Sequence, residues 1–150
     1  MLVNTSIVAT ETPSRYWEIR CTIQAAIDAA APGDTIKVYP GTYNETAANR
    51  TLFNGTGLYQ FGLFIDKANL TIQGVDGAGA PINSYAGVAA LVTTNATNNF
   101  GYSGIFVQAD GVTISGLRIG PNSPSQNKTI EVIGDAFTLK HSHFDVAPNA

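Results

Sequence analysis

The fold is decided by residues 63–74, LFIDKANLTIQG, because the same pattern returns twice further along the chain. Residues 105–116 read IFVQADGVTISG and residues 130–141 read IEVIGDAFTLKH. In each copy two short alternating segments flank a turn of three or four residues, and the last two copies are 25 residues apart. Alternation with β-branched residues is typical of strands that bury one face. The chain therefore contains an internal repeat built from short strands.

A repeat of this length, without a helix between its strands, is typical of a β-solenoid. In such a fold the rungs lie about 4.8 Å apart in parallel sheets and the inward aliphatic side chains stack in columns. We therefore expect an all-β fold in which Thr71, Thr113 and Thr138 face outward. The inward positions expected to be buried are Ile36, Val38, Leu63, Ile65, Leu70, Ile72, Ile105, Val107, Val112, Ile114, Ile130, Val132 and Leu139.

One helix is predicted, over residues 22–31, where apolar residues recur at i, i+3, i+4 and i+7 before a Pro-Gly stop. It precedes the first strand, so we expect it to cap the N-terminal end of the solenoid. Residues 1–21 form an N-terminal extension with a possible added strand for the edge of a neighbouring chain. Residues 22–150 form one β-helix domain with coils over residues 34–145, and residues 76–103 are predicted to be an inserted loop.

The stretch TIQAAIDAAAPGDTIKVYPGTYNE, residues 22–45, resembles the opening of right-handed parallel β-helix proteins of the pectin lyase-like group. Together with NLTIQG at residues 69–74 and GVTISG at residues 111–116, the resemblance extends over most of residues 22–145. It implies a right-handed parallel β-helix (β-solenoid) with an N-terminal capping α-helix. It implies little about function, since methylesterases, lyases, epimerases, adhesins and structural fibres share this opening.

Composition excludes several classes of protein. The chain has 150 residues, 8 Lys and Arg against 11 Asp and Glu, and only 13% charged residues. No basic run is present, so nucleic acid is not an expected partner, and no apolar stretch approaches the roughly 20 residues of a membrane span. The single Cys21 cannot form an internal disulfide.

The repeat alignment places Asp76, Arg118 and His143 at one position of successive coils, as a candidate outward polar column. Such a column could serve as an acid/base or carboxylate-binding site on a polysaccharide, and Lys140 could join Arg118 and His143 in it. The family resemblance implies an Arg or Lys base on an outer face in the lyases. The alternative is a solvated ladder of opposite charges with little effect on stability.

Two further groups of residues are candidate metal sites, and the first of them also has a purely structural interpretation. Asp110 and Asp135 align in turns and could share a Ca²⁺ ion, or simply bond their own backbone. His141 and His143, with Asp145, have the spacing of side chains on one strand face and could hold a metal. No other His or Cys ligand supports that site, and the signature motifs of pectin methylesterases and pectate lyases are missing. We therefore assign no catalytic residue, no metal and no cofactor.

The chain is rich in Asn-x-Ser/Thr sequons. Seven occur, whereas 12 Asn and 24 Ser plus Thr give about two by chance in 150 residues. The acceptor residues are Asn4, Asn44, Asn49, Asn54, Asn69, Asn95 and Asn127. The excess indicates N-glycosylation and an extracellular or cell-surface location, although Asn and Thr are also common in solenoid turns.

These observations favour a non-catalytic extracellular β-helix module of a surface or fibre-forming protein over an enzyme. The alternative is the N-terminal segment of a polysaccharide-acting β-helix enzyme, a lyase, esterase or epimerase. We expect an open coil near residues 130–144, covered either by further coils or by another subunit. Self-association through open ends or through the N-terminal strand is the partner interaction we expect, and head-to-tail contacts would give filaments.

Overall fold

The computed structural model describes residues 6–9, 22–46, 48–51, 58–88, 90–94, 103–120 and 128–145. These residues contain α1 (Ile23–Ala29), a short 3₁₀ helix η1 (Tyr85–Gly87) and thirteen strands. The strands are β1 (Ser6–Ala9), β2 (Thr35–Val38), β3 (Gly41–Glu45), β4 (Ala48–Thr51), β5 (Leu58–Ile65), β6 (Thr71–Gly74), β7 (Ala90–Thr94), β8 (Ser103–Val107), β9 (Thr113–Ser115), β10 (Arg118–Ile119), β11 (Lys128–Val132), β12 (Thr138–Lys140) and β13 (His143–Phe144).

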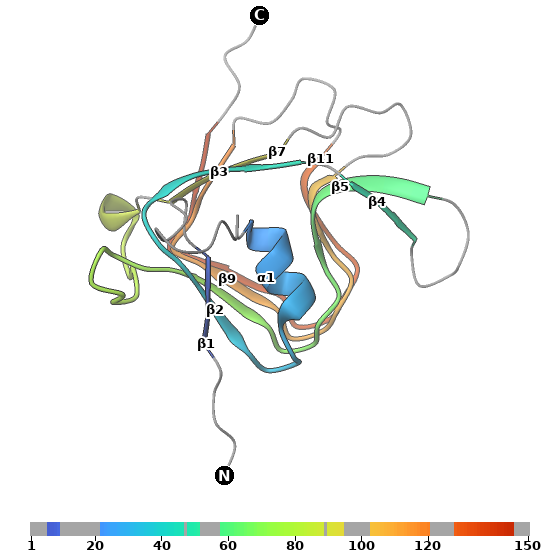
Figure 1. Ribbon diagram of the computed structural model, residues 1–150, viewed down its shortest axis with the longest axis horizontal. Coiled ribbons are helices and arrows are strands. Elements are labelled where there is room, and N and C mark those ends of the chain that lie inside the picture. Colours follow the sequence, from blue (N-terminus) through green and yellow to red (C-terminus); the bar gives the residue numbers. More distant parts are fainter. Residues whose placement is uncertain are drawn as a thin grey trace, which may run out of the picture.

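The strands form three sheets. Sheet A has the order β1-β2-β6-β9-β12, sheet B the order β3-β7-β10-β13, and sheet C the order β4-β5-β8-β11. All neighbouring strands are parallel except β4 and β5, which are antiparallel. Seen end-on, the sheets surround α1 (Figure 1). The expectation of a mostly β fold with parallel sheets and one α-helix is confirmed.

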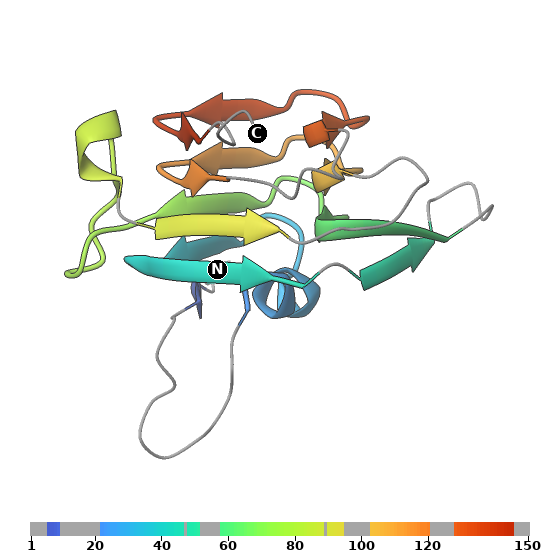
Figure 2. The same ribbon diagram turned by 90° about the horizontal axis from the view of Figure 1, so that it is seen from above.

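Each of the three repeats of the sequence contributes one strand to each sheet, and we call the strands of one layer a rung. The layer before the first repeat has described strands in sheets A and B. Rung 1 contains β2 and β3, rung 2 β5, β6 and β7, rung 3 β8, β9 and β10, and rung 4 β11, β12 and β13. The register follows the repeat, since Ile72 pairs with Ile114 and Ile114 with Leu139. Figure 2 shows the rungs as successive layers, with the C-terminal strands in the outermost layer.

The buried core follows the predicted alternation in rungs 1 to 3, where every expected inward aliphatic residue is at most 1% exposed. Thr71 and Thr113 on the other face are half-buried and Thr138 is exposed. Rung 4 differs, because Val132 is 37% and Leu139 36% exposed, and Ile130 is only partly buried. The prediction of burial is wrong for these side chains because their strands are the last in each sheet and no described strand covers them.

The turns that lead into the strands of sheet A repeat one backbone conformation. A left-handed residue stands at the same position of each: Gly33 (φ 88°), Asn69 (φ 56°), Gly111 (φ 70°) and Ala136 (φ 56°). The N–H groups of the first three donate to a carbonyl of the next rung, Gly33 to Ala68 at 3.0 Å, Asn69 to Asp110 at 2.8 Å and Gly111 to Asp135 at 2.8 Å. This ladder of turns holds neighbouring rungs in register although their spacing along the sequence differs.

The helix α1 is tied to the sheets at its N-terminus. The Thr22 side chain accepts a hydrogen bond from the Ala25 N–H at 3.0 Å. A carboxylate from β3, Glu45, accepts from the N–H groups of Ile23 at 2.8 Å and Gln24 at 3.3 Å. The free N–H groups of the first turn are therefore satisfied by a cap and by a distant strand.

A second contact joins α1 to sheet C. The Gln24 side-chain amide accepts from the Phe64 N–H at 2.7 Å and donates to the Phe64 carbonyl at 3.1 Å. This pair of bonds imitates strand pairing along the part of β5 that β4 does not cover. Ile23 and Ile27 of α1 are fully buried in the aliphatic core, so the helix packs against the sheets through its apolar face.

Two predicted segments differ from expectation. Residues 76–103 are not a loop throughout, because β7 lies within them and joins sheet B between β3 and β10. Among the described residues, the part before β7 leaves the stack, beginning with a bridge between Val75 and Pro81. In the N-terminal extension, β1 pairs in parallel with β2 of its own chain.

Candidate functional site

The outer face of sheet B carries part of the predicted polar column. Arg118 and His143 are register partners on β10 and β13. The residue beside Arg118 on its other side is Leu91 of β7, so Asp76 does not belong to this column. The structure brings two of the three residues together.

A third residue, Asp145, completes a polar cluster with Arg118 and His143. The Arg118 Nε lies 3.0 Å and 2.8 Å from the two carboxylate oxygens of Asp145. The His143 Nε2 lies 3.5 Å from Asp145 Oδ1. The arginine and histidine side chains are 50% and 57% exposed, so water screens these charges and the ion pair adds little stability.

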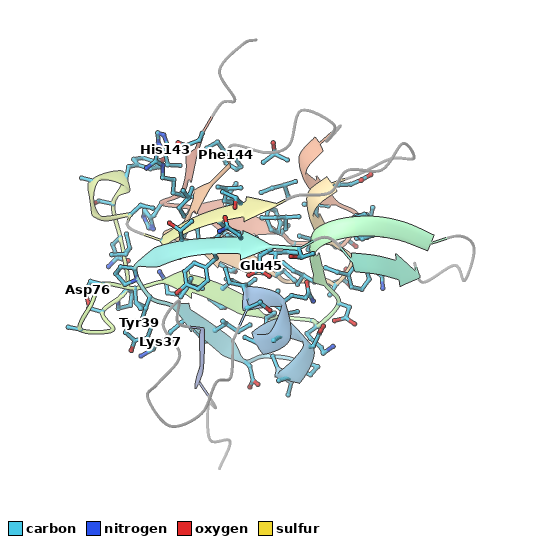
Figure 3. All side chains as sticks on the ribbon, turned by 45° about the horizontal axis from the view of Figure 1, so that its top comes forward. Lys37, Tyr39, Glu45, Asp76, His143 and Phe144 are labelled. Carbon is cyan, nitrogen blue, oxygen red and sulfur yellow. The ribbon has the colours of Figure 1, made fainter. Side chains whose placement is uncertain are left out.

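Asp76 serves a local turn instead. Its Oδ1 accepts hydrogen bonds from the N–H groups of Ala78 and Ala80, each at 2.9 Å. Its own N–H donates to the Ala80 carbonyl at 2.9 Å. Figure 3 shows Asp76 and His143 on separate parts of the molecule. Asp76 therefore stabilises the segment that leaves the stack after β6.

The predicted His141 and His143 pair does not share one strand face. His141 lies in the bend between β12 and β13 with φ 50°, so the alternation that would align the two rings is interrupted. Its Nδ1 is 3.5 Å from Ser115 Oγ, one rung below, whereas His143 lies beside Asp145. Lys140 is exposed on β12, in a different sheet from Arg118.

Asp110 and Asp135 meet in the turn ladder through the backbone. Asp110 Oδ1 accepts from the Asp135 N–H at 2.8 Å. This bond differs from the one expected within a single turn, because the Asp110 carboxylate bonds the backbone of the next rung. Among the residues that the structure describes, no group of three or more His, Cys, Asp or Glu side chains is placed to hold a metal ion.

Two sequon asparagines have described side chains, and both are exposed. Asn44 lies on β3, where its Oδ1 accepts from Thr93 Oγ1 at 2.5 Å. Asn69 occupies the left-handed turn position before β6. Asn49 lies on β4, but its side chain is outside the described part. The remaining sequons, Asn4, Asn54, Asn95 and Asn127, also fall outside the described residues.

The sequence motifs do not point to the one buried acid of the described core. Glu45 is 2% exposed, and Figure 3 shows it between β3 and α1. Burial raises the pKa of Glu45 above the ordinary value of 4.5, partly opposed by the hydrogen bonds from the Ile23 and Gln24 N–H groups. Its contacts assign it to holding the cap helix.

The largest group of exposed apolar side chains in the described part of the chain lies on rung 4. Among the described residues, four of the five large apolar side chains that are exposed belong to this end: Val132, Ile133, Leu139 and Phe144. Their equivalents one rung below, such as Val107, Ile114 and Ile119, are at most 1% exposed. Among the described residues, rung 4 is therefore the last layer, where the apolar columns and an edge of each sheet are uncovered.

Comparison with protein-family models, with curated proteins and with solved structures found no match. Within the described part of the chain, no helix has the length and apolar character needed to cross a membrane.

Proposed function

We propose that the chain is a right-handed parallel β-helix module with a structural role, located outside the cell or at its surface and N-glycosylated. The observation that carries the architecture is the register. Three successive repeats place Ile72, Ile114 and Leu139 side by side in sheet A. A helix that satisfies its own N-terminus through β3 covers the first rung, as expected of a solenoid cap.

Outward polar side chains support the structural role. Thr93 donates to Asn44 across neighbouring strands of sheet B, and Arg118 contacts Asp145 at the next rung. These contacts link one rung to the next, which is a structural role.

The enzyme alternative makes different demands on the outer faces. An active site on a uronic-acid polymer needs a cation for the carboxylate, a base for the C5 proton and an acid for the leaving oxygen.

The exposed asparagines support the location. Asn44 lies on β3 in sheet B and Asn69 lies in the turn before β6, and both side chains are exposed to solvent. N-glycans at these positions would shield the outer faces of the sheets from lateral association.

The glycosylation part is tested on protein isolated from its natural source. We expect a loss of mass on treatment with peptide N-glycosidase, and smaller losses in the Asn44→Gln and Asn69→Gln variants. Asn83 is exposed but is followed by Ser84 and Tyr85, so it is no sequon, and Asn83→Gln is the matched control. An intact mass equal to that of the bare chain would refute glycosylation.

A second candidate, the segment of a polysaccharide-acting enzyme, is favoured by one observation. Arg118 and His143 lie side by side with half of each side chain exposed, and Asp145 orients the guanidinium. Unsaturated-product absorbance on pectic and alginate polymers, with and without added Ca²⁺, separates the two functions. We expect no turnover. Turnover that disappears in Arg118→Ala would support the enzyme.

A further inference from the structure

The side chain of Gln24 in α1 bonds the backbone of β5 as a neighbouring strand would. Its Oε1 accepts a hydrogen bond from the Phe64 N–H at 2.7 Å, and its Nε2 donates to the Phe64 carbonyl at 3.1 Å. In a β-sheet these two groups of a residue are the ones that an adjacent strand bonds. Phe64 is buried and Gln24 is half-buried. A strand that paired with Phe64 would therefore have to displace the Gln24 amide.

The N–H and carbonyl of Phe64 face the side of β5 that lies away from β8. The carbonyl of the next residue, Ile65, accepts from the Gln108 N–H at 2.9 Å, on the side of β8. Backbone groups of successive strand residues alternate between the two sides of a strand, so those of Phe64 point the other way. Among the described residues, β4 pairs with residues 58–61 of β5 and Gln24 bonds Phe64.

Asp28 determines which way round the Gln24 amide lies. The Nε2 of Gln24 also donates to Asp28 Oδ1 at 2.9 Å, one helical turn further on. A carboxylate accepts hydrogen bonds and does not donate them, so this contact requires the amide nitrogen on the Asp28 side and leaves the amide oxygen for the Phe64 N–H. The backbone N–H of Gln24 is itself bonded to Glu45 Oε2 at 3.3 Å. Both the position and the orientation of the amide are thus fixed.

We propose that Gln24, oriented by Asp28, blocks the addition of an extended segment from a second copy of the chain to this edge of sheet C. Unpaired strand edges accept strands of other chains through main-chain hydrogen bonds. A second copy carries suitable segments, because residues 105–107 and 130–132 already pair in register along sheet C. The inference rests on the proposed β-helix module but requires neither glycans nor the absence of an active site, so its failure leaves the rest of that proposal in place.

The test compares two variants by light scattering after size exclusion over a concentration series. Gln24→Met removes both bonds to Phe64 but keeps an unbranched side chain of similar helix propensity. Gln73→Met is the matched control, because the half-buried Gln73 also donates to a backbone carbonyl, that of Gly74 at 2.7 Å, but lies on β6 between β2 and β9. We expect Gln24→Met to associate about tenfold more tightly than the unmodified chain, the effect of one or two net hydrogen bonds. Gln73→Met is expected to leave association unchanged.

Hydrogen exchange on the unmodified chain keeps the test independent of how the variants fold. The Phe64 amide is expected to be protected there, and to exchange about tenfold faster in dilute Gln24→Met. A Phe64 amide that exchanges at the rate of an unfolded chain would overturn the proposal, because the contact with Gln24 would then be absent.

The association data have equally definite outcomes. A natively folded Gln24→Met that associates no more tightly than the unmodified chain, or no more tightly than Gln73→Met, would overturn the proposal. If Gln24→Met loses its native circular dichroism, Gln24→Asn, whose amide is one methylene shorter, takes its place in the same comparison. Loss of native circular dichroism in both would assign the amide to folding and overturn the proposal. In each case native circular dichroism of the unmodified chain leaves the proposed module standing.

Discussion

Replacing Gly74 by alanine tests the stacking of rung 2 on rung 3 directly. A Cβ at this position would lie 1.9 Å from the Gly116 carbonyl oxygen and 2.7 Å from its carbon. It would also lie 3.3 Å from a methyl group of Leu117. The first two atoms belong to backbone, so no rotamer change relieves the clash and the two rungs must separate locally. Overpacking in a close-packed interior costs about 1–3 kcal/mol, and a backbone clash belongs at the upper end.

The assay is urea unfolding followed by circular dichroism, with thermal unfolding as a second readout. A loss of about 2–3 kcal/mol in a domain of this size corresponds to a fall in the melting temperature of roughly 4–12 °C. We expect the midpoint to move while the slope with urea stays unchanged, since the same surface is exposed on unfolding.

Gly77→Ala is the matched control. Nothing lies within 4 Å of a Cβ at Gly77, which is exposed in the segment after β6. The control is expected to shift the free energy of unfolding by no more than about 0.5 kcal/mol. If Gly74→Ala were as mild as Gly77→Ala, the close approach of rungs 2 and 3 would be refuted, and with it the register of the stack.

Three further changes address the turns, the cap and the polar cluster. A Cβ at Gly33 would meet no atom within 4 Å, but Gly33 has φ 88°. Backbone strain alone should therefore lower the free energy of unfolding of Gly33→Ala by about 1–2 kcal/mol, measured in urea. An unchanged free energy would contradict the left-handed turn. Glu45→Gln removes an acid whose pKa burial raises. The native protein holds that proton more tightly than the unfolded chain, so the stabilisation is complete below the ordinary pKa of 4.5 and is lost as pH rises through the raised value. The wild type should thus lose stability relative to Glu45→Gln between pH 4 and pH 7. Urea unfolding of both proteins at each pH measures this difference in the free energy of unfolding. A wild type that gains stability relative to the variant at pH 7 would contradict the prediction. Arg118→Ala breaks a half-exposed ion pair with Asp145 and should cost less than about 1 kcal/mol, so a larger loss of the free energy of unfolding would show that the pair holds rungs 3 and 4 together.

The parallel sheets and most of the core could be predicted because the signal is local and repeated. Alternation within a triplet such as residues 112–114 decides which side chains point inward, and the repeat shows which residues become neighbours. Burial of Val132 and Leu139 could not be predicted in this way. The triplets look alike in all copies, whereas exposure depends on whether another strand follows in space.

The misplacement of Asp76 has a different cause. Extending the alignment two residues past β6 assumes that the chain turns directly into the next strand, as it does after β9. Instead it leaves the stack and returns at β7, so Leu91 lies beside Arg118. Residues 90–94, ALVTT, are rich in β-branched residues, and reading them as a strand would have placed Leu91 in this column beside Arg118.

Glu45 shows a limit of local sequence reasoning. A capping box would place a Glu or Gln three residues after Thr22, but that position is Ala25. The missing acid comes from β3, 22 residues after Ile23, and bonds the N–H groups that a capping box leaves open. Nothing in the helix identifies its partner, although the absence of an acid in the first turn indicates that one is needed.

The two ends of the stack are stabilised by different means, and this asymmetry governs how the molecule opens. At the first rung, α1 contributes buried isoleucines and its side chains satisfy strand edges, so Ile36 and Val38 are fully buried. At rung 4 the column of Ile36 ends in Leu139, and the column of Val92 and Ile119 in sheet B ends in Phe144. Both end residues keep more than a third of their surface in water. Local unfolding starts where the least apolar surface is buried, so among the described rungs we expect rung 4 to open before rungs 1 and 2. Any surface that covers rung 4, from another copy or another segment, stabilises the part of the stack that is otherwise first to open.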